Sequence, residues 1–177
     1  MDNFAEQLVK KEQTSSDAMK KAMIYSLGIL LTITLLMLVF FSNGIVSFII
    51  VVLAAGTAYG MRSLAMRLNI EYEYTVTNGE LDIDKIIAQS KRTRLITVYT
   101  RRLTAFGKYS EDIPESEELT VVLASDNIAS HEYYADANHN EHGKVRIIFS
   151  PDTKMLSIIN IYLPSKLRLS KSDLEKL

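Results

Sequence analysis

The side chains best placed to do chemistry are five basic residues in the second half of the chain: Lys91, Arg92, Arg94, Arg101 and Arg102. Near a membrane, each Lys or Arg adds roughly 1 kcal/mol of attraction to anionic lipid headgroups. An acidic run follows at residues 111–118, so a solvated face held by salt bridges is the alternative interpretation. The five residues are therefore a candidate surface for anionic lipid or for a protein partner.

A second pattern is the His-x-x-His spacing of His139 and His142, with Asp136 and Glu141 close by and His131 further upstream. Imidazole and carboxylate groups at such spacing could bind a metal ion. The stretch is Asn-rich and turn-like, which favours solvent-exposed loop histidines. We therefore predict no metal site.

Enzymatic motifs are absent from the sequence. There is no Cys nucleophile, no Gly-x-Ser-x-Gly elbow and no Gly-rich phosphate loop. We expect a protein that is not an enzyme, with no catalytic residues and no cofactor, and a membrane hydrolase is disfavoured for the same reason. A net charge of −1 argues against nucleic acid as a partner.

A long apolar block without charged residues precedes the candidate residues and must determine where they lie. No Asp, Glu, Lys or Arg occurs from Met23 to Met61. Residues 22–41 are long enough to cross a bilayer, and residues 45–61 can do so by extending to about residue 68. The turn Ser42-Asn43-Gly44 separates them, so residues 22–68 predict a transmembrane helical hairpin. Basic residues flank both outer ends and none lies in the turn, which predicts a multi-pass protein of the cell membrane with both termini cytoplasmic.

Small residues mark one face of the second apolar run. Gly56 and Gly60 form a Gly-x-x-x-Gly pair, a spacing that allows close helix packing. They could pack on Gly28 and Ser26 of the first run, or form the face of a homo-oligomer. The absence of ionisable residues inside the runs argues against a transporter, proton relay or channel.

The regions on either side of the hairpin are polar. Residues 1–21 form an amphipathic cytoplasmic leader in which Phe4, Leu8 and Val9 could share one helical face. After the hairpin, residues 71–77 and the segment from Glu80 alternate as strands around Asn78-Gly79, the preferred type I′ turn. Further strands are expected at residues 94–100, 119–124, 132–137 and 144–149. Residues 102–109 are expected to form a strand that pairs with residues 94–100.

A helix should follow the last strand. Ser150 is a candidate N-cap, Pro151 suits the first helical position and Pro164 marks the end. The fold class expected is an α+β membrane protein. A transmembrane hairpin precedes a small antiparallel β barrel or sandwich at residues 69–165, closed by a C-terminal α-helix, and residues 166–177 form a charged tail.

The hairpin followed by Glu-Tyr-Glu-Tyr-Thr-Val-Thr-Asn-Gly-Glu-Leu-Asp-Ile-Asp-Lys-Ile at residues 71–86 resembles a family of small membrane proteins of Firmicutes, the DUF6106 type. The pattern Tyr74-x-Val76-Thr77-Asn78-Gly79 also resembles the first hairpin of bacterial pleckstrin-homology-like (PH-like) domains. That resemblance implies binding of lipids, peptides or proteins, and the fold alone does not decide which. The expected function is a membrane-anchored PH-like module that binds a protein partner or anionic lipid headgroups. The alternative is a structural subunit of a larger membrane complex, assembled through the small-residue face.

Overall fold

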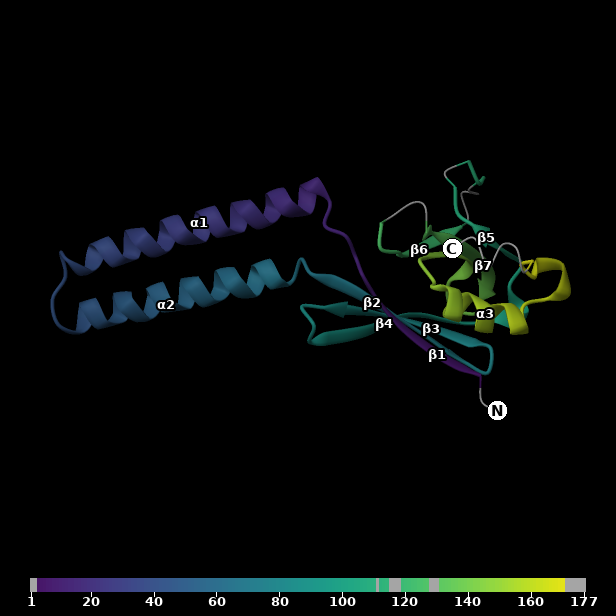
Figure 1. Ribbon diagram of the computed structural model, residues 1–177. Coiled ribbons are helices and arrows are strands. Elements are labelled where there is room, and N and C mark those ends of the chain that lie inside the picture. The colour runs from purple at the N-terminus through teal and green to yellow at the C-terminus, as the bar shows by residue number, and fades with distance from the viewer. Residues whose placement is uncertain (1–2, 111, 115–118, 128–130, 171–177) are drawn as a thin grey trace. The chain divides into compact units, whose positions relative to one another are not determined.

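The computed structural model describes residues 3–110, 112–114, 119–127 and 131–170. The chain divides into two compact units: Gln13–Asn69, and Met1–Glu12 together with Ile70–Leu177. The first unit is therefore an insertion in the sequence of the second. Figure 1 labels helices and strands of both units.

The inserted unit is a hairpin of two long helices, α1 (Ser15–Val39) and α2 (Ile45–Met66). Gly44 has a φ of 56°, a left-handed conformation that glycine adopts at little cost. The hydroxyls of Ser42 and Ser47 are 2.9 Å apart across the turn. The expected helical hairpin is confirmed.

The less exposed side chains of α1 and α2 recur every three or four residues, which is the spacing of paired helices. Thr32 and Thr57 approach each other between the helices, with 3.0 Å separating their hydroxyl oxygens. A Cβ added at Gly28 would lie 2.5 Å from Sδ of Met61, so glycine makes room for that side chain. Gly28 therefore packs against α2.

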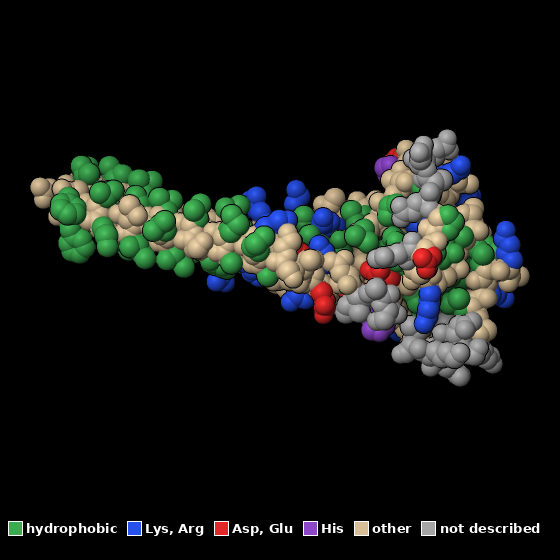
Figure 2. Space-filling model, turned by 90° about the horizontal axis from the view of Figure 1, so that it is seen from above, with side chains coloured by type: hydrophobic (Ala, Val, Ile, Leu, Met, Phe, Trp, Pro, Cys, Tyr) green, Lys and Arg blue, Asp and Glu red, His purple; other side chains and the backbone are tan. Residues whose placement is uncertain are grey.

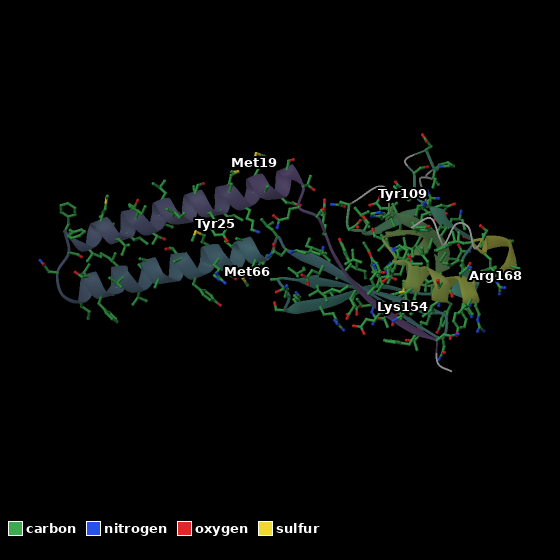
Figure 3. All side chains as sticks on the ribbon, in the orientation of Figure 1. Met19, Tyr25, Met66, Tyr109, Lys154 and Arg168 are labelled. Atoms are coloured by element: carbon green, nitrogen blue, oxygen red, sulfur yellow. The ribbon has the colours of Figure 1, made fainter. Side chains whose placement is uncertain are left out.

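Many apolar side chains are exposed on the hairpin, as the face in Figure 2 shows. Met19 of α1, for example, projects outward and is 62% exposed (Figure 3). By length and composition, both helices could cross a membrane.

The first sheet of the other unit is antiparallel, in the order β1-β2-β3-β4. Its strands are β1 (Phe4–Lys10), β2 (Ile70–Thr77), β3 (Glu80–Ile87) and β4 (Lys91–Tyr99). Asn78 and Gly79 have φ angles of 52° and 89°, as a type I′ turn requires, so the predicted hairpin is confirmed.

The helical face predicted in the leader is wrong, because residues 4–10 form strand β1. Ala5 and Val9 enter the core, whereas Leu8 is 59% exposed on the other face. Gln7 lies between the two buried residues, donates from Nε2 to the Ser150 carbonyl and accepts at Oε1 from the Asp152 N–H. These long-range bonds satisfy a polar side chain at a position where the alternation calls for an apolar one.

The second sheet has the order β5-β7-β8-β6. Its strands are β5 (Ala105–Lys108), β6 (Thr120–Ala124), β7 (Tyr133–His139) and β8 (Gly143–Phe149). The expectation of a wholly antiparallel arrangement is wrong, since β6 runs parallel to β8.

Strand β5 corrects a second expectation, because it pairs with β7 and not with the segment 94–100. The short 3-10 helix η1 (Thr100–Arg102) follows β4 directly. The N–H and hydroxyl of Thr100 both donate to the Gly79 carbonyl, at 2.8 and 2.9 Å. These two hydrogen bonds fix the chain at the point where it leaves β4 of the first sheet and continues to β5 of the second.

Helix α3 (Thr153–Tyr162) confirms the expected C-terminal helix, but it begins after Asp152. Asp152 is the N-cap and accepts from the Met155 N–H at 2.6 Å. Ser150, the predicted cap, instead donates its hydroxyl to Asp126 Oδ1 at 2.7 Å. The helix is followed by η3 (Ser165–Leu167), and residues 171–177 of the predicted tail lie outside the described residues.

One apolar core joins both sheets and α3. Tyr74 is fully buried at the junction. Its hydroxyl donates to the Ala124 carbonyl and accepts from the Ser150 N–H at 3.2 Å, so one side chain links β2 to the ends of β6 and β8. Burial raises the pKa of this hydroxyl and keeps it neutral.

Candidate functional site

The outer face of the first sheet carries part of the predicted basic surface. Leu81 and Ile83 of β3 point into the core, so the intervening Asp82 and Asp84 lie on the opposite face. The register places Asp84 beside Glu73 on one side and beside Arg94 on the other. Carboxylates and guanidinium groups therefore occupy the same surface.

Arg92 and Arg94 form ion pairs within this face. Arg92 contacts Glu73, and Arg94 contacts both Asp82 and Asp84. Sequence reasoning missed these three carboxylates as partners. The strict alternation of apolar and polar residues in β2 and β3 was the signal that placed these carboxylates on the outer face. The two arginines thus have the salt bridges that the alternative interpretation requires.

The five basic residues do not form one cluster. Lys91, Arg92 and Arg94 lie in the first half of β4, whereas Arg101 and Arg102 belong to η1 after its end. A strand of 9 residues is about 30 Å long. The Arg101 guanidinium lies 5.1 Å from the centre of the Tyr162 ring, and that of Arg102 lies 5.3 Å from the Tyr99 ring.

Glu73 is an unusual ionisable group on the outer face, because it is only 8% exposed. Burial raises its pKa, and a hydrogen bond and like charge from Glu6 and the charge of Asp84 raise it further. The guanidinium of Arg92 acts in the opposite direction. Glu73 therefore binds its proton more tightly in the folded protein than in the unfolded chain.

We expect Glu73→Gln to leave the protein as stable as the wild type at neutral pH, or more stable. A carboxyl whose folded pKa is raised stabilises the fold fully at pH below its unfolded pKa, and this contribution is lost as pH rises through the folded pKa. Gln lacks this pH dependence. The pair with Arg92, which is 58% exposed, contributes only about 0–1 kcal/mol.

Denaturant unfolding of both proteins across the acidic to neutral range measures the difference. The advantage of Gln should grow as pH rises. A variant that is less stable at neutral pH, with the same pH dependence as the wild type, would show that the ion pair outweighs the burial cost.

The histidine pair shows no metal-binding geometry. The rings of His139 and His142 stack at 4.9 Å, and the Glu141 N–H donates to His139 Nδ1 at 3.2 Å. The Asp136 carboxylate accepts two bonds of 2.8 Å from Arg146. Within the described ranges, no three His, Asp or Glu side chains are grouped to hold a metal ion.

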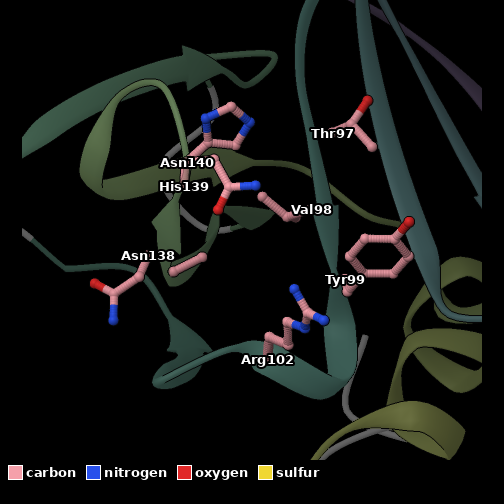
Figure 4. A pocket seen from close by; sticks show the side chains of 8 residues that line it. Thr97, Val98, Tyr99, Arg102, Asn138, His139 and Asn140 are labelled. Atoms are coloured by element: carbon pink, nitrogen blue, oxygen red, sulfur yellow. The ribbon is translucent and has the colours of Figure 1, made fainter.

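A small pocket of about 80 Å³ lies between β4, η1 and the end of β7 (Figure 4). Arg102 approaches it from η1, His139 borders it from the end of β7, and Asn140 borders it from the turn that follows. Its lining comprises Thr97, Val98, Tyr99, Arg102, Ala137, Asn138, His139 and Asn140. No carboxylate lines it, so it suits a small polar or anionic group.

In the hairpin, the predicted packing face of Gly56 and Gly60 leaves space beside both glycines. A Cβ added at Gly56 or Gly60 would meet nothing within 4 Å. Gly60 nevertheless lines a groove between the helices together with Gly28, Thr57 and Met61. Gly28 meets Met61, while the Cβ positions of Gly56 and Gly60 remain open.

Comparison with known families shows that a family model described as the bacterial PH-like domain (DUF6106) matches residues 1–169. No curated protein and no solved structure matches the chain. The family model covers the hairpin, both sheets and α3, in agreement with the resemblance seen in the sequence. The chain belongs to the DUF6106 family of bacterial PH-like domains.

Proposed function

We propose that the protein is a non-enzymatic, membrane-anchored PH-like module, which presents a cytoplasmic surface to a protein partner or to anionic lipid headgroups. The observation that carries this proposal is the insertion of two exposed apolar helices between the paired strands β1 and β2. An anchored domain meets partners on the same membrane at a raised effective concentration, so weak contacts suffice.

The distribution of charge supports a divided binding surface. The charges of Arg92 and Arg94 are offset by carboxylates, whereas the guanidinium groups of Arg101 and Arg102 make cation–π contacts with aromatic rings. Arg102 also borders the small pocket, which has no acidic lining residue. The η1 end therefore suits an acidic group of a partner.

The test uses the full chain in its own membrane. It should stay in the membrane pellet after alkaline carbonate extraction, and cross-linking should capture a protein partner whose yield falls in the double variant Arg101→Ala, Arg102→Ala. Arg94→Ala is the matched control, because its charge is already offset by Asp82 and Asp84. Release of the chain by carbonate, or equal capture by all three proteins, would contradict the proposal.

A second candidate is a structural subunit of a larger membrane complex. The open Cβ positions of Gly56 and Gly60 favour it, because small residues allow another helix to approach closely. The double variant Gly56→Leu, Gly60→Leu should lose a membrane protein that co-purifies in mild detergent, while Val46→Leu on the same helix should retain it. Unchanged co-purification by both variants would remove this candidate.

A further inference from the structure

The turn between β3 and β4 is a feature that the family match does not explain. Ile87 pairs with Ile70, the first residue of β2, so the turn lies at the end of the sheet where β2 begins. Lys91 is the partner of Ile87 on β4. We call residues 86–92 the β3–β4 tip, and we propose that this tip contacts the anionic surface of the membrane in which the hairpin is anchored. The inference rests on the anchoring proposed above.

Chain connectivity brings the tip within reach of that surface. Helix α2 ends at Met66 and β2 begins at Ile70. Four residue steps span at most about 14 Å of extended chain, and paired strands are about 5 Å apart. Ile87 is therefore within about 20 Å of the end of α2, a limit that holds for any orientation of the two units.

The side chains of the tip suit a lipid interface. Ile86 and Ile87 are half-buried at the end of β3, and the side chain of Lys91 is exposed. Arg92 is also exposed, but its charge is offset by the ion pair with Glu73, so Lys91 supplies the basic charge of the tip. Apolar groups can enter the headgroup region while basic groups attract anionic lipid. The acidic group nearest in the register, Glu71, is 7% exposed and accepts from Gln89 Nε2 at 3.2 Å, which keeps it away from the surface.

The backbone of the tip is also unusual. Ala88 and Gln89 have φ angles of 53° and 55°. Residues other than Gly, Asn and Asp rarely adopt this left-handed conformation, and such strain gathers at functional positions. The turn at the other end of β3 uses Asn78-Gly79, which adopts positive φ readily. The tip therefore contains an unfavourable turn, because Ala88 and Gln89 have positive φ angles and neither is Gly, Asn or Asp.

The other end of the same sheet provides the control. Thr77 is exposed there beside Glu80, its partner on β3. It is separated from the tip by the length of the strands. Since the sequence contains no Trp, one introduced Trp reports a single position.

The experiment compares Ser90→Trp at the tip with Thr77→Trp at the far end, each in the full chain. Both are reconstituted into vesicles of phosphatidylcholine alone, or of phosphatidylcholine mixed with phosphatidylglycerol. Quenching by lipid brominated near the headgroup should be stronger for Trp at residue 90 than at residue 77. The emission of Trp at residue 90 should also shift to shorter wavelength, and both effects should be larger with phosphatidylglycerol.

Adding Lys91→Gln to the Ser90→Trp protein should shift the equilibrium between docked and free tip about five-fold, since one basic group near an anionic surface is removed. Quenching in the phosphatidylglycerol vesicles should fall accordingly. Thermal unfolding of each variant, followed by circular dichroism, should confirm that the fold is retained.

Two failures are distinguishable. Equal, weak quenching at both positions in a chain that resists carbonate extraction would overturn the tip contact and leave the anchoring proposal standing. Release of the chain by carbonate would overturn both.

Discussion

Replacing Arg146 by Met should destabilise the unit that contains both sheets by about 3 kcal/mol, the low end for breaking a buried pair, because it leaves the half-buried carboxylate of Asp136 without its cation. Arg146 is 5% exposed, and its Nε and Nη2 each donate to Asp136 at 2.8 Å. Its Nη1 donates to the Pro114 carbonyl at 3.1 Å, and its guanidinium lies 5.2 Å from the Tyr134 ring. Denaturant unfolding of the full chain in detergent measures the loss.

The companion variant separates the ion pair from the burial of Arg146. Arg146→Met combined with Asp136→Leu removes both charges and should recover much of the lost stability, as apolar replacements of buried pairs often do. Arg146→Lys keeps the charge without the two parallel bonds and should be intermediate. If the double variant were as unstable as Arg146→Met, packing of Arg146 and its bond to Pro114 would dominate.

Val9→Ser should cost about 2–4 kcal/mol, whereas Leu8→Ser should cost less than about 1 kcal/mol. Val9 is 7% exposed in the core, and its neighbour Leu8 is 59% exposed. Serine at residue 9 removes apolar burial and places a hydroxyl among apolar groups. The same denaturant unfolding experiment in detergent compares the two variants.

This pair of variants distinguishes the strand from the helix first expected. On a helical face shared by Phe4, Leu8 and Val9, both serines would weaken the same contact. Equal losses at the two positions would therefore argue for a helical leader and against pairing of β1 with β2.

Local patterns in the sequence predicted what depends on local physics. The long apolar runs predicted the helical hairpin, and Asn78-Gly79 predicted the turn between β2 and β3. The residues before Thr153 predicted helix α3 to within a few positions. Strand β1 was not predicted, because Gln7, the inward-facing residue at its centre, is polar. That side chain is satisfied by Ser150 and Asp152, which are far away in the sequence.

The candidate site was harder to predict for a related reason. The sequence places Lys91 and Arg102 close together, but β4 holds them at opposite ends. The partners of Arg92 and Arg94 lie on β2 and β3, so they depend on a register that only the folded sheet defines. Composition indicated a basic surface, whereas pairing decides which charges are offset.

The insertion of the hairpin between β1 and β2 has a consequence for biosynthesis. The ribosome releases β1 before the two apolar helices and β2 after them. If the helices cross a bilayer, β1 and β2 meet only when both helices have inserted. A single crossing would leave the two strands on opposite sides. At about 5–20 residues per second, β1 waits several seconds for its partner. Completion of the first sheet would then act as a check on topology, since only chains with an even number of crossings can fold.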